Sequence, residues 1–113
     1  MKIYHNPRCS KSRKTLKLLE ENAAGDIEVI RYLDTPPSRE ELKRLIEMLG
    51  IRPEELVRKN EAVYKERYKG KELSGEEWID AMAAHPKLIQ RPIVVKGDKA
   101  VIARPPENVE ELL

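Results

Sequence analysis

The only cysteine of this 113-residue chain, Cys9, lies in a segment that reads HNPRCSKSRKT. The thiolate is the nucleophilic form of cysteine, and helix N-termini and nearby cations lower a thiol pKa from about 8.5. A helix is expected to begin at Ser10, and the cations beside the cysteine are Arg8, Lys11, Arg13 and Lys14. The pattern therefore favours a reactive thiolate over a small buried cysteine, which is the commoner role of a free cysteine.

The cations reverse the usual charge of a helix start. The positive end of the helix dipole favours Asp and Glu, as in the SREE and SGEE segments that open two later helices. We interpret the four cations as tuning the local potential for a thiolate and an anionic substrate. Taken one by one, each is equally well explained as a solvated surface residue.

Ser12 stands where dithiol oxidoreductases carry a second, resolving cysteine. Its hydroxyl can donate a hydrogen bond toward the Cys9 sulfur but cannot form a disulfide. A redox cycle built on Cys9 must therefore use a thiol from another molecule. The alternative, an ordinary serine of a first helical turn, remains open.

Composition and residue spacing argue against nucleic-acid binding, membrane association and metal binding. Basic and acidic residues are intermixed and give a net charge of +2, which does not indicate nucleic acid or a membrane as partner. The sequence has no stretch of membrane-spanning length and no signal-peptide core at its start, so we expect a cytoplasmic protein. His5, His85 and Cys9 have no metal-ligand spacing, and we expect no metal.

The periodicity predicts an α/β chain. A strand is predicted over residues 2–5, and a second strand, parallel to it, over residues 27–33. Between them, residues 10–23 are predicted to form a helix that ends at Gly25 and carries Leu16, Leu19 and Ala23 on one face. Helices follow at about 39–49, 53–58, 61–68 and 75–84, the last burying Trp78, Ile79 and Met82. A hairpin over residues 92–103 and a short acidic helix over 106–113 complete a β-α-β, helical insertion, β-β-α order.

Four separated motifs, YHNPRCSKSRKTL, LVRKN, QRPIVV and ARPPE, resemble the glutaredoxin-coupled arsenate reductases, which have a thioredoxin-like fold. The resemblance covers nearly the whole chain. It implies one domain over residues 1–113, with a mixed four-stranded sheet built from residues 1–35 and 90–113 and a helical insertion over about 36–89.

The resemblance also assigns roles. It implies that Cys9 attacks arsenate, that His5 supports the thiolate, and that an Arg91–Pro92 cis peptide faces the cysteine. Ser12 completes the expected catalytic set because its hydroxyl can donate a hydrogen bond toward the Cys9 sulfur. The arginines that bind the oxyanion are Arg58, Arg91 and Arg104.

The implied activity is reduction of arsenate to arsenite by a monomer without bound cofactor, with glutathione as co-substrate and glutaredoxin as partner. Ser10 and Lys11 stand where the family commonly has Gly and Thr, so a glutathione-linked oxidoreductase with another substrate remains an alternative. A redox-related regulator that binds RNA polymerase is a second alternative, ranked last because many such regulators use a Cys-x-x-Cys switch that Ser12 removes.

Overall fold

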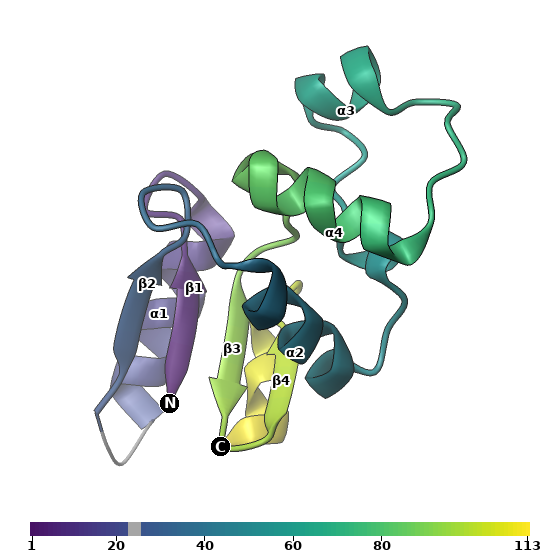
Figure 1. Cartoon of the computed structure of the whole chain (residues 1–113). Coiled ribbons are helices and arrows are strands. Elements are labelled where there is room, and N and C mark those ends of the chain that lie inside the picture. The colour runs from purple at the N-terminus through teal and green to yellow at the C-terminus, as the bar shows by residue number, and fades with distance from the viewer. Residues whose placement is uncertain (23–25) are drawn as a thin grey trace. The chain divides into compact units, whose positions relative to one another are not determined.

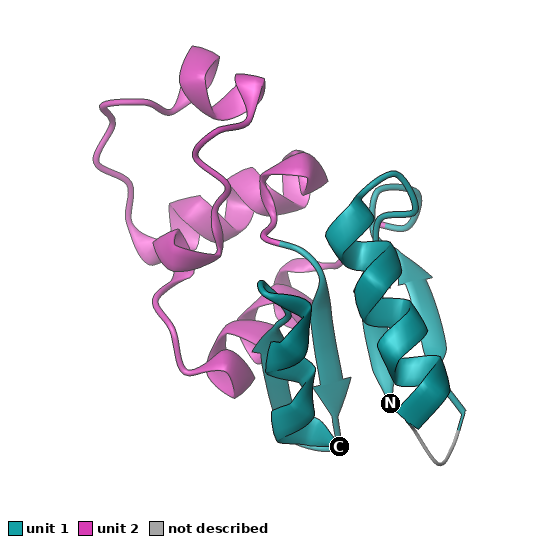
Figure 2. Ribbon diagram, turned by 180° about the vertical axis from the view of Figure 1, so that it is seen from behind, with its two compact units in different colours: residues 1–35, 91–113 teal, residues 36–90 magenta. Residues whose placement is uncertain are grey.

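The computed structural model of the protein describes residues 1–22 and 26–113. The chain divides into two compact units, the first made of residues 1–35 and 91–113 and the second of residues 36–90 (Figure 2). The expected placement of Ala23 and Gly25 at the end of the first helix lies outside the described residues.

The first unit contains a mixed four-stranded sheet in the order β2-β1-β3-β4 (Figure 1). β1 pairs in parallel with β2 and antiparallel with β3, which in turn pairs antiparallel with β4. The α/β prediction and the parallel first pair are thereby confirmed. The strands are β1 (Lys2–His5), β2 (Glu28–Arg31), β3 (Ile93–Lys96) and β4 (Lys99–Ile102).

One face of this sheet is covered by α1 (Ser10–Asn22) and by the C-terminal 3₁₀ helix η3 (Pro106–Leu112), as Figure 2 shows from behind. Side chains from the sheet and both helices form one apolar core, because the buried stripe of α1 faces the inward residues of β1 and β3. The core residues are Ile3, Leu19, Val94, Ala103, Val109 and Leu112.

β2 is shorter than the strand predicted over residues 27–33. After Arg31 the backbone turns, and the N–H groups of Asp34 and Thr35 both donate to the Arg31 carbonyl. Tyr32 is buried although it lies outside the strand. The apolar pattern of this segment extends the strand too far, because local turn hydrogen bonds replace the ladder, and it overstates burial, because Val29 of β2 is exposed.

The second unit is helical. Its largest helices, α2 (Arg39–Leu49) and α4 (Gly75–Ala84), pack against one another, and α4 also contacts two 3₁₀ helices. Trp78, Ile79 and Met82 are buried as predicted. The shorter elements are η1 (Pro53–Leu56), α3 (Ala62–Arg67) and η2 (Pro86–Leu88), of which η2 was not predicted.

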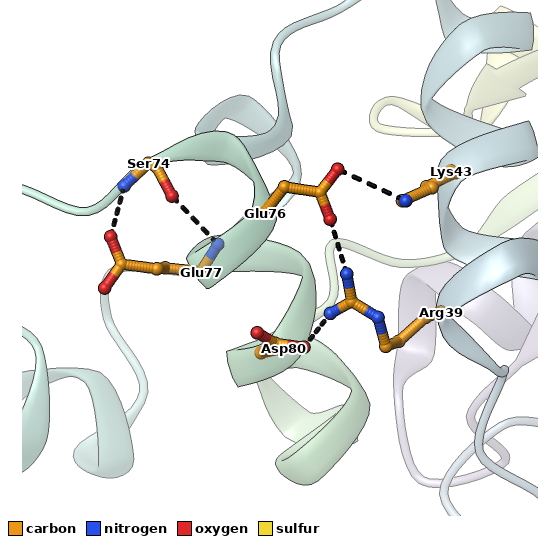
Figure 3. Close-up of polar contacts among 6 residues, drawn as sticks. All are labelled: Arg39, Lys43, Ser74, Glu76, Glu77 and Asp80. Atoms are coloured by element: carbon orange, nitrogen blue, oxygen red, sulfur yellow. Dashed lines mark hydrogen bonds and ion pairs between the residues drawn. The ribbon is translucent and has the colours of Figure 1, made fainter.

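Local capping explains why α2 and α4 begin where they do. Ser38 accepts a hydrogen bond from the Glu41 N–H, while Ser74 and Glu77 cap each other reciprocally (Figure 3). α2 ends at Gly50, whose φ of 67° is the left-handed conformation that glycine adopts without a Cβ clash. These side-chain and backbone features are local, which is why the sequence predicts both helices closely.

Charged side chains join α2 to α4 across their exposed sides. Arg39 pairs with Glu76 and Asp80, and Lys43 Nζ lies 3.2 Å from Glu76 Oε1 (Figure 3). Because these groups are exposed, the pairs orient the two helices more than they stabilise them.

Replacing Ser74 by alanine is expected to lower the free energy of unfolding by about 1 kcal/mol, because the first turn of α4 loses its capping acceptor. Urea denaturation followed by circular dichroism measures the change. Ser74→Thr is the matched control, since threonine retains a capping hydroxyl. An equal loss in both variants, or no loss in Ser74→Ala, would show that the cap does not stabilise α4.

Candidate active site

The strand register brings three loop segments to one end of the sheet in the first unit. β1 ends at His5 and leads into the Cys9 loop, and Ile93 at the start of β3 pairs with both Tyr4 of β1 and Ile102 at the end of β4. The residues just before β3 and just after β4 therefore lie beside the loop that follows β1. These segments carry Cys9, Arg91 and Arg104.

Asn6 folds the loop that presents the cysteine. Its carbonyl accepts the Cys9 N–H at 3.0 Å, closing a turn with Pro7 in second position. Its side-chain Oδ1 accepts the Arg8 N–H at 3.0 Å, and its own N–H donates to Ser12 Oγ at 3.0 Å. The residue is buried. The sequence analysis did not select Asn6, although an Asn-Pro pair is a turn signal that points to this position.

Cys9 is half-buried and lies just before the first residue of α1. Burial acts to raise the pKa of its thiol, but hydrogen bonds from the backbone N–H groups of Ser12 and Lys11 and from the Arg91 side chain outweigh burial and lower the pKa below its ordinary value. The positive charge of Arg91 acts in the same direction. The helix N-terminus and one guanidinium thus favour the thiolate form of Cys9.

The Arg91–Pro92 peptide is cis, as expected, and the Arg104–Pro105 peptide is also cis, which was not predicted. Arg104 Nη1 donates to the Arg91 carbonyl at 3.4 Å, so the two arginines are linked. Asn108 Nδ2 donates to the carbonyls of Ile102 at 3.1 Å and Arg104 at 3.3 Å, fixing the chain on either side of Ala103. Asn108 was missed because its partners depend on how η3 folds back onto β4.

His5 and Ser12 form a buried pair beneath the loop. His5 Nδ1 lies 2.6 Å from Ser12 Oγ, which also accepts the Asn6 N–H. Burial, followed by the charges of Arg31 and Arg13, lowers the pKa of His5 and so favours the neutral imidazole. Ser12 therefore turns its hydroxyl to His5 and its backbone N–H to Cys9, whereas the sequence analysis considered the hydroxyl as the donor to sulfur.

Arg58 lies in the second unit, where it is buried near the bridge between Val57 and Ile89. Its N–H donates to the Leu88 carbonyl at 2.6 Å, and its Nε lies 3.5 Å from Glu61 Oε1. The other five predicted site residues, Cys9, His5, Ser12, Arg91 and Arg104, belong to the first unit.

The side-chain hydrogen bond to Cys9 comes from Arg91 and not from the four cations next to the cysteine in the sequence. The charge that lowers the pKa of Cys9 belongs to Arg91, and the Lys11 contribution comes from its backbone N–H. Arg8, Lys11, Arg13 and Lys14 are exposed, and Arg13 Nη1 donates to the Pro7 carbonyl at 2.9 Å. These four cations therefore lie at the surface of the protein around the cysteine.

The rate of Cys9 alkylation by iodoacetamide is expected to rise with pH through an inflection below that of a urea-denatured control, because the folded thiol pKa is lowered. Linkage fixes the sign for stability. The thiolate contributes to the free energy of unfolding above the unfolded pKa, and this contribution is lost as pH falls through the folded pKa. An inflection at or above that of the denatured control would identify Cys9 as a packing residue.

Neither a metal site nor a membrane-crossing helix is found in the part of the chain that the structure describes. No three His, Cys, Asp or Glu side chains gather there to hold a metal ion, and no helix there is long and apolar enough to cross a membrane.

The chain is similar in sequence and in structure to arsenate reductases. The model of the ArsC family matches residues 4–112. The arsenate reductase of Neisseria meningitidis serogroup B is 44% identical over 100% of this chain and 97% of its own length, and Escherichia coli YfgD, described as uncharacterized, is 50% identical over 100% and 96%. The solved structure of the arsenate reductase from Vibrio cholerae is 51% identical, with a TM-score of 0.93 over 100% of this chain and 98% of that one.

Proposed function

The chain belongs to the ArsC family, and from this premise we propose that it is an oxidoreductase that reduces arsenate to arsenite through Cys9. The observation that carries the proposal is the set of groups that hydrogen-bond Cys9, namely the backbone N–H groups of Ser12 and Lys11 and the Arg91 guanidinium, which together lower the pKa of its thiol. A nucleophile and an anion-binding arginine thus stand side by side, as attack on an oxyanion requires.

In the proposed cycle the Cys9 thiolate attacks arsenic, a sulfur–arsenic bond forms and one oxygen leaves as water. The glutathione thiol then attacks the same arsenic atom, a second sulfur–arsenic bond forms, and a second oxygen leaves as water. A glutaredoxin thiolate attacks the glutathione sulfur, and the electron pair of the broken sulfur–arsenic bond reduces arsenic from the +5 to the +3 state. Hydrolysis releases arsenite and returns the Cys9 thiolate, while glutathione and glutaredoxin leave as a mixed disulfide.

The arginines serve to offset charge on the arsenate oxygens. A guanidinium presents paired N–H donors that match two oxygens of a tetrahedral anion. Arg91 and Arg104 are linked through the Arg91 carbonyl, which supports their acting on one anion. Arg58 is proposed to bind the oxyanion as well, on the basis of the LVRKN motif. The hydrogen-bonded pair of His5 and Ser12 is proposed to orient the Ser12 N–H toward Cys9.

We expect no bound cofactor, because both electrons come from thiols, and we place the reaction in the cytoplasm, where glutathione keeps thiols reduced. Position 12 holds a serine hydroxyl where dithiol oxidoreductases carry a second thiol, so Cys9 has no partner for an internal disulfide. The single cysteine therefore supports an external thiol donor. The protein is proposed to act as a monomer.

The proposal is tested by arsenate-dependent oxidation of NADPH in the presence of glutathione, glutathione reductase and glutaredoxin. Turnover that requires all of these components is the expected result. Turnover of another oxidised substrate under the same conditions, with arsenate inactive, would favour the alternative of a glutathione-linked oxidoreductase. Retention of the chain by purified RNA polymerase α-subunit, with no turnover of either kind, would favour the regulator.

A further inference from the structure

The charge of the chain is unevenly distributed along the sequence. The first 19 residues contain six of the 22 basic residues and none of the 20 acidic ones, since Glu20 is the first acid. The remaining residues therefore carry an excess of four negative charges. The net charge of +2 conceals a strongly basic segment centred on Cys9, within an otherwise acidic chain.

Five of the six cations of this segment, all except Lys2 of β1, are exposed residues around Cys9, and we call these five the basic patch. They lie in the Cys9 loop and along the first two turns of α1, and no acidic residue lies in the first turn of that helix. Within the described part of the chain, none of them pairs with a carboxylate. The basic patch consists of Arg8, Lys11, Arg13, Lys14 and Lys17.

Stability does not account for the basic patch. Lys11, Lys14 and Lys17 are spaced by three residues, so each is a neighbour of the next on the helix surface, and like charges at this spacing destabilise a helix. Cations at a helix N-terminus also oppose the helix dipole. Hydrogen bonding to Cys9 does not account for the patch either, because the donors to the sulfur are the backbone N–H groups of Ser12 and Lys11 and the side chain of Arg91, which lies outside the patch.

We propose that the basic patch is the docking surface for a thiol-disulfide reductase whose surface is acidic around its own reactive cysteine. The inference rests on the proposed function, which requires a second protein to bring a thiol to Cys9. Exposed cations around a half-buried sulfur are complementary to such a partner, and this complementarity speeds and orients encounter.

The reaction that reports docking is a thiol exchange that does not involve arsenate. Cys9 is first converted to its mixed disulfide with glutathione by incubation with glutathione disulfide. The thiolate of the partner attacks the glutathione sulfur, one sulfur–sulfur bond forms as another breaks, and Cys9 leaves as the thiolate. No net oxidation accompanies the exchange.

The test measures the second-order rate constant for this exchange with a glutaredoxin that has acidic residues beside its reactive cysteine. The double variant Lys14→Glu, Lys17→Glu reverses two charges of the basic patch without altering the loop that holds Cys9. The rate constant is expected to fall by about tenfold at low ionic strength. Added salt is expected to slow the wild-type protein and not the variant, because the attraction is screened.

Two controls separate docking from other effects. Lys2→Glu, Lys99→Glu makes the same change in net charge at exposed residues near the other end of the sheet, and its rate constant is expected to match that of the wild type. Dithiothreitol, a neutral dithiol, is expected to reduce all three proteins equally. Two results would overturn the proposal whether or not arsenate is a substrate. One is that the wild type and both double variants react with glutaredoxin at equal rates and with equal dependence on salt; the other is that both double variants are slowed equally.

Discussion

Replacing Cys9 by serine is expected to lower the rate of arsenate reduction by at least about a thousandfold. A serine hydroxyl is not ionised near neutral pH, so the variant has no anionic nucleophile that the backbone N–H groups and Arg91 could stabilise. The measurement is arsenate-dependent NADPH oxidation with glutathione, glutathione reductase and glutaredoxin in excess, so that the step at position 9 limits the rate.

Ser10→Ala is the matched control, because this neighbouring side chain is exposed and the substitution leaves the thiol in place. Its rate is expected to stay within about twofold of the wild type, as for surface substitutions that touch no special feature. Circular dichroism of both variants checks that they fold. A Cys9→Ser protein that turns over at the wild-type rate would remove Cys9 from the mechanism.

Replacing Arg91 by alanine is expected to lower kcat/KM for arsenate by about a hundredfold to a thousandfold, the range typical for loss of one preorganised donor. Two effects contribute. The oxyanion loses a guanidinium, and the pKa of the Cys9 thiol rises because the hydrogen bond and charge of Arg91 both lower it. The alkylation inflection of Cys9 is therefore expected to move upward in the same variant.

Arg91→Lys separates charge from geometry. Lysine retains the positive charge but not the paired N–H fork, so the rate is expected to remain far below that of the wild type. Arg67→Lys is the control, because Arg67 is exposed on α3. Equal activity of Arg91→Lys and the wild type would show that position 91 acts as a point charge alone.

The helices and strands were predicted well where their signals are local. Ser38 and Gly50 bound α2, and Ser74 with Glu77 begins α4, because each contact joins residues close in sequence. Elements without such signals were missed or misjudged. The 3₁₀ helix η2 spans only three residues, and the end of β2 depends on turn hydrogen bonds to Arg31.

The candidate site was predictable in its residue types and less so in its geometry. The helix start after Cys9 indicated an anion site, and the structure supplies its donors from Ser12 and Lys11. The proximity of Arg91 depends on the antiparallel register of β3 beside β1, which no local pattern encodes. The sequence also attributed the lowered thiol pKa to the cations next to Cys9 in the chain, whereas the side chain that donates a hydrogen bond to the sulfur is that of Arg91, which the fold brings there.

Arsenite formed from arsenate by the purified protein, quantified by arsenic speciation, tests the central claim most directly. With glutathione and glutaredoxin present, the wild-type protein is expected to form many arsenite molecules per protein, and none after complete alkylation of Cys9 verified by intact mass. Arsenite formation by the alkylated protein at the wild-type rate, or none by the reduced wild-type protein, would contradict the claim that the Cys9 thiolate reduces arsenate.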